Sequence, residues 1–247
     1  METLAAQQET SNMPIETGEA LSIAEANAEL LESTVVGRII KPVYEAALAA
    51  EPTLESVRLT SIDPQENPKL AFAQPGWSSE GGVSEVHIQL GDEALETAQT
   101  VLKEHPDSIA IMAELTGVKP EEMSQQQLLE FALLHELGHA LLYEEFADQP
   151  EDYKNLTADE RIKLPIGNAS PSYLRSEEGR KFVDNKWEDI QEHLGVRTFD
   201  ELLELQSKAY RKMKQEVFAD NFASKILEKQ SKKKRIMRRF LDKALTA

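Results

Sequence analysis

The spacing of apolar residues predicts two consecutive helices near the start of the chain. Apolar side chains recur at helical intervals from Ala20 to Leu31 and from Val36 to Ala50. Between the two stretches lie Ser33 and Thr34, which are residue types that cap helices. Pro52 follows the second stretch closely, as is common just beyond the end of a helix.

After Pro52 the pattern changes from helical spacing to alternation. The segments SVRLTSID, KLAFAQPGW and SEVHIQLG each alternate apolar and polar residues, and Pro and Gly separate them. Alternation of this kind is typical of short strands that bury one face. We therefore expect a small antiparallel sheet.

Helical spacing returns after the third strand segment. Asp92 to Glu104 and Ser108 to Thr116 are predicted to be helices. Ser124 and Gln127 have the spacing of a capping box, in which each residue satisfies a backbone N–H of the other. This pair predicts the start of a long amphipathic helix that ends near Phe146.

The remainder of the chain is predicted to contain a polar loop and two further helical stretches. Pro and Gly interrupt the segment from Gln149 to Ser172, which favours a surface loop or lid. Helical spacing resumes from about Ser176 to Leu194. Another helix is expected to begin at Thr198 and to reach at least Leu227, with Leu245 as its furthest end.

These patterns divide the 247 residues into three parts. Residues 1–19 are polar with few large apolar groups, which is typical of a disordered arm. Residues 20–228 contain the predicted elements and form one domain with an N-terminal helical extension. Residues 229–247 form a basic C-terminal helix or tail. The predicted fold class is α+β, with helices outweighing strands.

Charge is unevenly distributed along the chain. The net charge is −17, yet residues 225–247 contain nine Lys and Arg against two acids, so that the preceding residues carry −24. A body this acidic should repel nucleic acid and anionic membranes. We expect no sequence-specific nucleic-acid binding. The basic segment either docks on the acidic body or binds an anionic partner.

The beginning of the sequence lacks the basic start and apolar run of a secretory signal. No stretch reaches the roughly 18 uninterrupted apolar residues of a membrane span. We therefore expect no transmembrane segment and a cytoplasmic location. Cysteine is absent, so that any metal site must use His, Asp and Glu as ligands.

The long predicted helix contains the sequence HELGH, from His135 to His139. Histidines four residues apart lie about one turn apart on a helix, so both imidazoles can bind one zinc ion. Glu136 is displaced by about 100° from His135 and can accept a proton from a water molecule without binding the metal. Alternatively, both histidines are hydrogen-bonded core residues, although burying two His and a Glu without a role is costly.

A catalytic zinc ion needs a third protein ligand and an open position. Glu145 stands six residues after His139, where a metzincin would place a ligand. However, Leu142 replaces the glycine of that pattern, and a straight helix carries Glu145 roughly 9 Å beyond His139 along the axis. Peptide deformylase uses a Cys as its third ligand, and this chain has none.

A better third ligand lies on the later helix, in QEVFADNFA. Glu216 and Asp220 are four residues apart, share a helix face and have mostly apolar neighbours. Glu216 is the candidate zinc ligand, and Asp220 is the candidate acceptor for the other ring N–H of a ligating histidine. The alternative is an ordinary amphipathic helix with acids on its wet side.

HELGH followed by Glu-x-x-Ala-Asp resembles the gluzincin clan of zinc metallopeptidases. The similarity is greatest to the soluble catalytic parts of the HtpX and prenyl-protease families and to the ImmA/IrrE-type proteins. It implies a zincin-like metallopeptidase domain with the small sheet packed on the HExxH helix. It also implies that His135, His139 and Glu216 bind zinc, that Glu136 is the catalytic base and that Asp220 is the outer acid.

Two features of substrate handling follow as hypotheses. The oxyanion of peptide hydrolysis needs a hydrogen-bond donor, for which His193, Tyr210, Arg211 and Tyr173 are candidates and His193 is favoured. In this clan an edge strand typically aligns an extended peptide. The strand from Ser84 to Leu90 is either that edge strand or an interior strand paired on both sides.

The sequence therefore predicts a zinc-dependent metallopeptidase that acts on peptide or protein substrates. The alternative is a catalytically inactive zincin-like module that binds or regulates a partner through its basic tail. Glu136 favours the enzyme, because a structural zinc site has no use for an acid there and normally closes with a fourth protein ligand.

Overall fold

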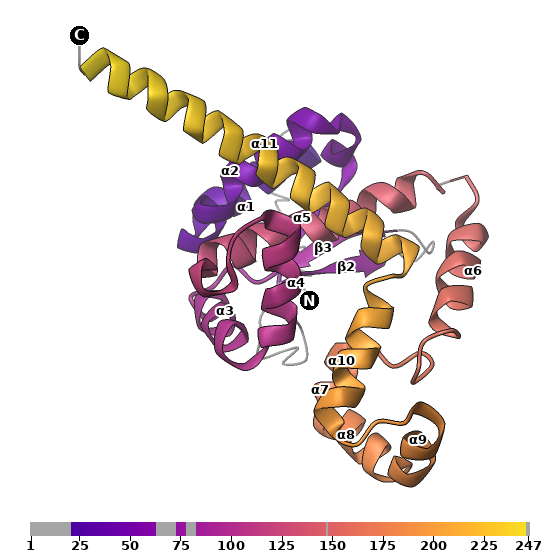
Figure 1. The fold of residues 1–247 in the computed structure, drawn as a ribbon. Helices are drawn as coiled ribbons and strands as arrows, with labels where there is room; N and C mark the ends of the chain where they lie inside the picture. The colour runs from indigo at the N-terminus through magenta and orange to yellow at the C-terminus, as the bar shows by residue number, and fades with distance from the viewer. Residues whose placement is uncertain (1–20, 63–72, 78–82, 147, 246–247) are drawn as a thin grey trace, which may run out of the picture.

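The computed structural model describes residues 21–62, 73–77, 83–146 and 148–245. These residues form eleven α-helices and three short strands, so that the expected helix-rich α+β class is confirmed (Figure 1). The predicted disordered arm, residues 1–19, lies outside the described residues. So do Leu70 and Phe72 of the second predicted strand.

The helices of the first half are α1 (Ile23–Ser33), α2 (Val35–Ala50), α3 (Glu93–Glu104), α4 (Pro106–Thr116) and α5 (Gln125–Glu144), with short 3-10 turns at Pro52–Ser56 and Pro120–Glu122. Those of the second half are α6 (Pro150–Arg161), α7 (Pro171–Arg175), α8 (Glu177–Asp184), α9 (Trp187–Leu194), α10 (Phe199–Tyr210) and α11 (Lys214–Leu245). The caps predicted at the starts of α2 and α5 are present. Thr34 accepts a hydrogen bond from the backbone of Gly37, and Ser124 forms a capping box with Gln127.

The strands β1 (Arg58–Ser61), β2 (Ala73–Trp77) and β3 (Val83–Ile88) form one sheet in the order β1-β3-β2. β3 is antiparallel to β2 but parallel to β1, because β3 rather than β2 lies beside the first strand. The expectation of a purely antiparallel sheet was therefore wrong for one pair. β3 is the interior strand, which also excludes it as the peptide-binding edge.

Helix α5 is the central element of the main core. It contacts the sheet, α2, α3 and α11, and thirteen of its twenty residues are buried. A helix that is apolar on nearly all sides is typical of such a central position. The sheet packs on the helix that carries HELGH, as predicted, and the two histidines of that motif lie inside the fold.

Helices α5 and α11 approach each other closely at Gly138. A Cβ atom added there would lie 2.7 Å from the Cα atom of Ala219, a distance that side chains essentially never show. Glycine on one helix and alanine on the other therefore allow the two backbones to approach more closely than larger side chains would. This approach places the first turns of α11 directly over the HELGH segment.

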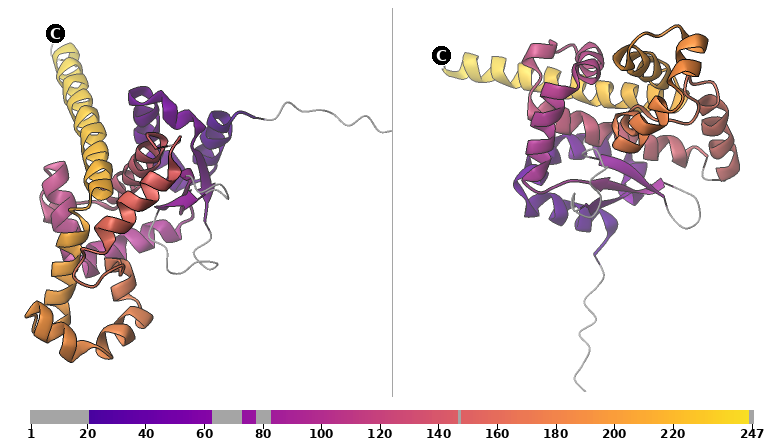
Figure 2. Two further views of the ribbon diagram at one scale, coloured as in Figure 1. Left: turned by 90° about the vertical axis from the view of Figure 1, so that its right-hand side faces the viewer. Right: turned by 90° about the horizontal axis from the view of Figure 1, so that it is seen from below.

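Helices α7 to α10 pack around a second, smaller cluster of buried residues: Leu174, Val183, Ile190, Val196 and Leu202. Figures 1 and 2 show these helices grouped together, away from α1 and α2. Gln206 ties the group internally, because its side chain accepts from the backbone of Ile166 and donates to the backbone of Ala169.

Three predictions in this region need correction. The predicted loop from Gln149 contains α6, because Pro150 opens a helix there instead of breaking one. The helix predicted from Ser176 to Leu194 is divided into α8 and α9. The helix predicted to run on from Thr198 breaks at residues 211–213, where the carboxylate of Glu160 accepts a 2.7 Å hydrogen bond from the first backbone N–H of α11.

The basic C-terminal segment continues α11 as one long helix. Gln230 donates to the backbone of Pro42 on α2, but the last turns run beyond the other elements in every view (Figures 1 and 2). Whether the basic residues beyond Gln230 dock on the acidic body or bind an anionic partner stays a prediction. Within the described ranges, every helix is too short or too polar to cross a membrane.

The close approach of α5 and α11 predicts that Gly138→Ala destabilises the protein. Helix propensity alone would make alanine more stable by about 1 kcal/mol, so that a net loss reports the clash with Ala219. We expect a net loss of about 1–2 kcal/mol in urea unfolding of the metal-free protein. The control is Glu144→Ala, at an exposed position of the same helix. Unchanged or increased stability of Gly138→Ala would contradict the packing described.

Candidate metal centre

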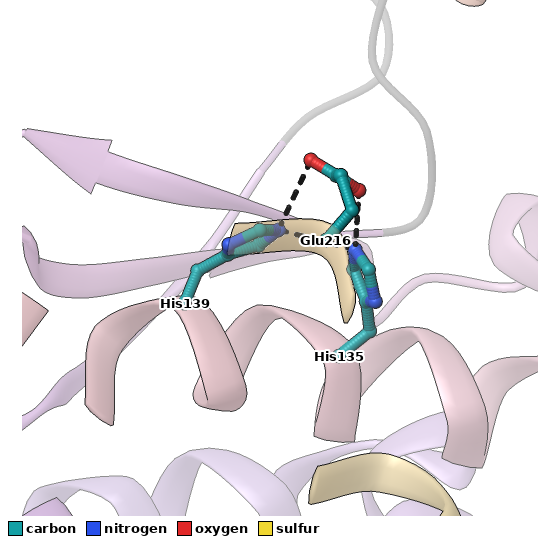
Figure 3. Close-up of side chains that lie close together, drawn as sticks. All are labelled: His135, His139 and Glu216. Carbon is teal, nitrogen blue, oxygen red and sulfur yellow. Dashed lines mark hydrogen bonds and ion pairs between the residues drawn. The ribbon is translucent and has the colours of Figure 1, made fainter. Parts of the chain in front are cut away.

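Three buried side chains from two helices meet at one point (Figure 3). His135 and His139 project from α5, and Glu216 projects from the first turn of α11. The two imidazole Nε2 atoms are 3.1 Å apart. The Glu216 carboxylate lies 3.3 Å from Nε2 of His135 and 3.6 Å from Nε2 of His139.

This arrangement fits a zinc ion. Tetrahedral coordination with bonds of about 2.0–2.1 Å places neighbouring ligand atoms about 3.3 Å apart, which is close to the observed separations. Two histidines and one carboxylate also match the three-ligand set of catalytic zinc sites, whereas structural sites usually have four protein ligands. In the part of the chain that the structure describes, this is the only group of three such side chains with suitable spacing.

Asp220, the predicted acceptor for a ligating histidine, lies beside His135. Its Oδ1 atom is 2.9 Å from His135 Nδ1, close in distance although off the ideal hydrogen-bond angle. The Arg211 guanidinium donates to the same oxygen at 2.7 Å and lies 3.9 Å from Glu216. An outer carboxylate at this position orients the imidazole and selects the tautomer that leaves Nε2 for the metal.

The charges of this cluster are strongly coupled in the absence of metal. Burial alone would lower the pKa of His135, but Asp220 and Glu216 outweigh it and raise that pKa to about 9. Burial would likewise raise the pKa of Glu216, but both histidines and Arg211 lower it to about 2. Burial and the nearby His135 lower the pKa of His139 to about 4. The metal-free cluster therefore favours a proton on His135.

Glu136 lies beside the three candidate ligands without joining them. Its Oε2 atom is buried and has no hydrogen-bond partner among the described residues. Burial raises the pKa of this carboxyl group to about 7. A buried, unpaired carboxylate is costly unless it has a role, and a pKa near neutrality suits a group that accepts and returns a proton.

A cavity of about 600 Å³ opens over the cluster, lined by all three candidate ligands and by Glu136. One wall comes from α3, α4 and α5 and includes Val101, Ile111, Met112, Leu128 and Phe131. The facing wall comes from α6, α7 and the α10–α11 junction and includes Tyr153, Arg161, Arg175, Tyr210 and Arg211. The cluster therefore faces a space large enough for a section of peptide.

Three other residues that the sequence made candidates lie away from the cluster. His193 is exposed on α9, where its Nδ1 atom contacts the Asp189 carbonyl, and it does not line the cavity. The structure does not bring it to the site, because the buried side of α9 faces the small helical cluster. Tyr173 also lies outside the cavity lining, and Glu145 is exposed at the end of α5.

Tyr210 and Arg211 are the two oxyanion candidates that line the cavity. Burial, assisted by the charge of Glu216, raises the pKa of the Tyr210 phenol, so that it keeps its proton and remains a donor at neutral pH. The sequence made both residues candidates but favoured His193. The signal it missed is their position beside Glu216, which depends on the turn between α10 and α11.

The contact between Asp220 and His135 predicts that Asp220→Asn weakens zinc binding. The substitution keeps the size of the side chain but removes the charge that orients His135 and holds Arg211. We expect zinc affinity to fall about 10- to 100-fold, measured by competition with a chelating dye. Asn221→Ala, at the adjacent exposed position of α11, is the control and should bind zinc as the wild type does.

The raised pKa of His135 predicts that zinc binding releases a proton. His135 is protonated below about pH 9 in the metal-free protein, whereas a metal ligand must be neutral. Apparent zinc affinity should therefore rise about tenfold per pH unit up to that pH and then level off. Calorimetry in two buffers of different ionisation enthalpy should show about one proton released at neutral pH. Binding without proton release would contradict the electrostatics described.

Comparison of the chain with models of known protein families, with curated protein sequences and with solved structures finds no match. We therefore infer the function from the geometry and chemistry of these side chains.

Proposed function

We propose that this protein is a zinc-dependent metallopeptidase. The observation that carries the proposal is the convergence of His135, His139 and Glu216 beside a buried carboxylate, Glu136, that has no partner among the described residues. The cavity over the cluster supplies room for a peptide. HELGH on α5 and Glu-x-x-Ala-Asp on α11 support placement of the enzyme in the gluzincin clan, with a zincin-like fold.

Each residue has a distinct part in the proposed reaction. His135, His139 and Glu216 would hold a zinc ion, which would supply a Lewis acid that activates water and polarises the substrate carbonyl. Glu136 accepts the proton of the attacking water at its buried carboxylate and then returns it to the leaving amine. Tyr210 donates its phenolic proton in a hydrogen bond to the developing oxyanion.

Arg211 and Asp220 act through His135. The 2.7 Å contact between them fixes the Asp220 carboxylate, and that carboxylate fixes the orientation of the imidazole. The pair therefore keeps this candidate ligand in place without entering the reaction itself.

The alternative of a catalytically inactive module explains fewer of these observations. Such a module would need neither the cavity nor an unpaired carboxylate next to the candidate ligands. A structural zinc site would also normally have a fourth protein ligand, and no fourth side chain joins the described group. An active enzyme accounts for the cavity, the unpaired carboxylate and the group of only three ligands.

The proposal predicts different effects for Glu136→Gln and Glu216→Ala. Glu136→Gln should retain one zinc per chain and lose at least about 10²-fold in hydrolysis of an unstructured protein, because only the proton acceptor is removed. Glu216→Ala should lose both zinc and activity. Metal content by atomic absorption and peptide release together check these outcomes.

The control is Glu145→Ala, which removes an exposed acid from the end of the same helix that carries HELGH. It should keep both zinc and activity. Full hydrolysis by Glu136→Gln, or loss of zinc on changing Glu145 but not Glu216, would overturn the proposal.

A further inference from the structure

The cavity over the candidate metal centre differs in charge from the rest of the chain. The whole sequence contains 44 acidic and 27 basic residues, Lys and Arg being counted as basic. The cavity lining contains three arginines, and its only acidic members are Glu136 and Glu216, which already have roles in the proposed site. An acidic protein thus has a cavity whose remaining charged side chains are all cationic.

The three arginines come from one side of the cavity and differ in their surroundings. Arg211 is committed to Asp220, and Arg175 interacts with another residue of the protein. Arg161, at the C-terminal end of α6, forms no hydrogen bond or ion pair through its guanidinium within the described ranges, and it is exposed. It is therefore the arginine that remains available to a ligand.

Arg161 lies close to the groups that would contact a substrate. Its charge acts on the pKa of both Tyr153 and Tyr210, against the larger and opposite effect of burial. Both tyrosines line the cavity, and Tyr210 lies beside Glu216. A group bound by Arg161 would therefore lie a short distance along the substrate from the bond to be cleaved.

We infer that Arg161 binds a carboxylate of the substrate. The enzyme therefore favours substrates that carry a carboxylate on one side of the scissile bond. The inference rests on the proposed peptidase function. A guanidinium offers paired N–H donors that match the two oxygens of a carboxylate, and the resulting charge-assisted hydrogen bonds are stronger than neutral ones. The carboxylate belongs either to an Asp or Glu side chain or to the free C-terminus of the substrate.

The wall formed by α3, α4 and α5 adds a second element of selectivity. Its lining includes Val101, Ile111, Met112 and Phe131, which form an apolar surface across the cluster from the arginines. The free energy falls when apolar side chains move from water to such a surface. The favoured substrate therefore carries an apolar residue on the other side of the scissile bond.

The acidity of the whole protein does not cancel this preference. In about 0.15 M salt the Debye length is about 8 Å, so that exposed charges further away are largely screened. A carboxylate inside the cavity interacts mainly with the arginines that line it. The preference should accordingly persist at physiological ionic strength and weaken as salt is added.

Peptides that differ in one charge test the inference. A fluorescent peptide with Glu at each position around an apolar residue is compared with its Gln counterpart, and each is made with a free or an amidated C-terminus. Binding is measured by anisotropy on the zinc-loaded Glu136→Gln protein, and kcat/KM is measured on the zinc-loaded wild type. Binding should weaken about three- to tenfold when the recognised carboxylate is removed.

The response of three variants, at two arginines, identifies the group that recognises the carboxylate. In Arg161→Gln the difference between Glu and Gln peptides should fall below about twofold, and Arg161→Glu should favour Lys at the same position. Arg197→Gln removes the same charge from an exposed position outside the cavity lining and should keep the wild-type preference. All three variants are carried in the Glu136→Gln background for the binding measurement.

The outcomes separate this inference from the proposed function. Preference for internal Glu identifies a side-chain carboxylate, and preference for the free terminus identifies carboxypeptidase-like recognition. Equal binding of all peptides, or a preference unchanged in Arg161→Gln, overturns the inference even if the wild type hydrolyses protein. An Arg161-dependent preference in binding without any hydrolysis by the wild type supports the recognition site and overturns the peptidase.

Discussion

The site depends on how closely two helices approach each other. Where the two helices meet, Gly138 of α5 has no side chain and Ala219 of α11 has only a methyl group. Because the backbones come this close, a carboxylate from the first turn of α11 can reach two imidazoles on α5. A larger residue at position 138 would move the helices apart by a distance comparable to the tolerance of a metal site. The glycine of HELGH therefore has a structural role as definite as those proposed for the histidines and the glutamate.

The cluster also explains how so many ionisable groups tolerate burial. His135, Glu216, Asp220 and Arg211 form a connected set of opposite charges, in which a proton on His135 balances the carboxylates when metal is absent. Breaking one member of a buried charge network leaves its partners uncompensated, which costs more than removing the whole network. The proposed zinc ion would replace that proton at the same place. The fold can thus assemble the site before metal binds, at the cost of competition between proton and metal.

How much the sequence predicts depends on whether the information is local. The spacing of His135 and His139 lies within one helix, so helical geometry alone predicts that the two imidazoles converge. Caps such as Ser124 with Gln127 are equally local and were found correctly. Glu216 is distant in sequence, and its apolar neighbours and the motif around it made it a candidate without fixing its position. The structure supplies the proximity that spacing could not.

Other features were missed because they depend on tertiary contacts. The apolar period continues through residues 211–213, so that periodicity gives no sign of the break between α10 and α11. At that break Glu160 accepts a hydrogen bond from the backbone N–H of Lys214, and Arg211 donates to Asp220. The sheet was mispredicted in one pair for a similar reason, because alternation identifies strands but not their order.

Crystals of the full chain soaked with zinc and measured at the zinc absorption edge test the central claim most directly. The account predicts one anomalous peak within about 2.0–2.2 Å of His135 Nε2, His139 Nε2 and a Glu216 oxygen. A zinc-saturated crystal without a peak there would contradict it.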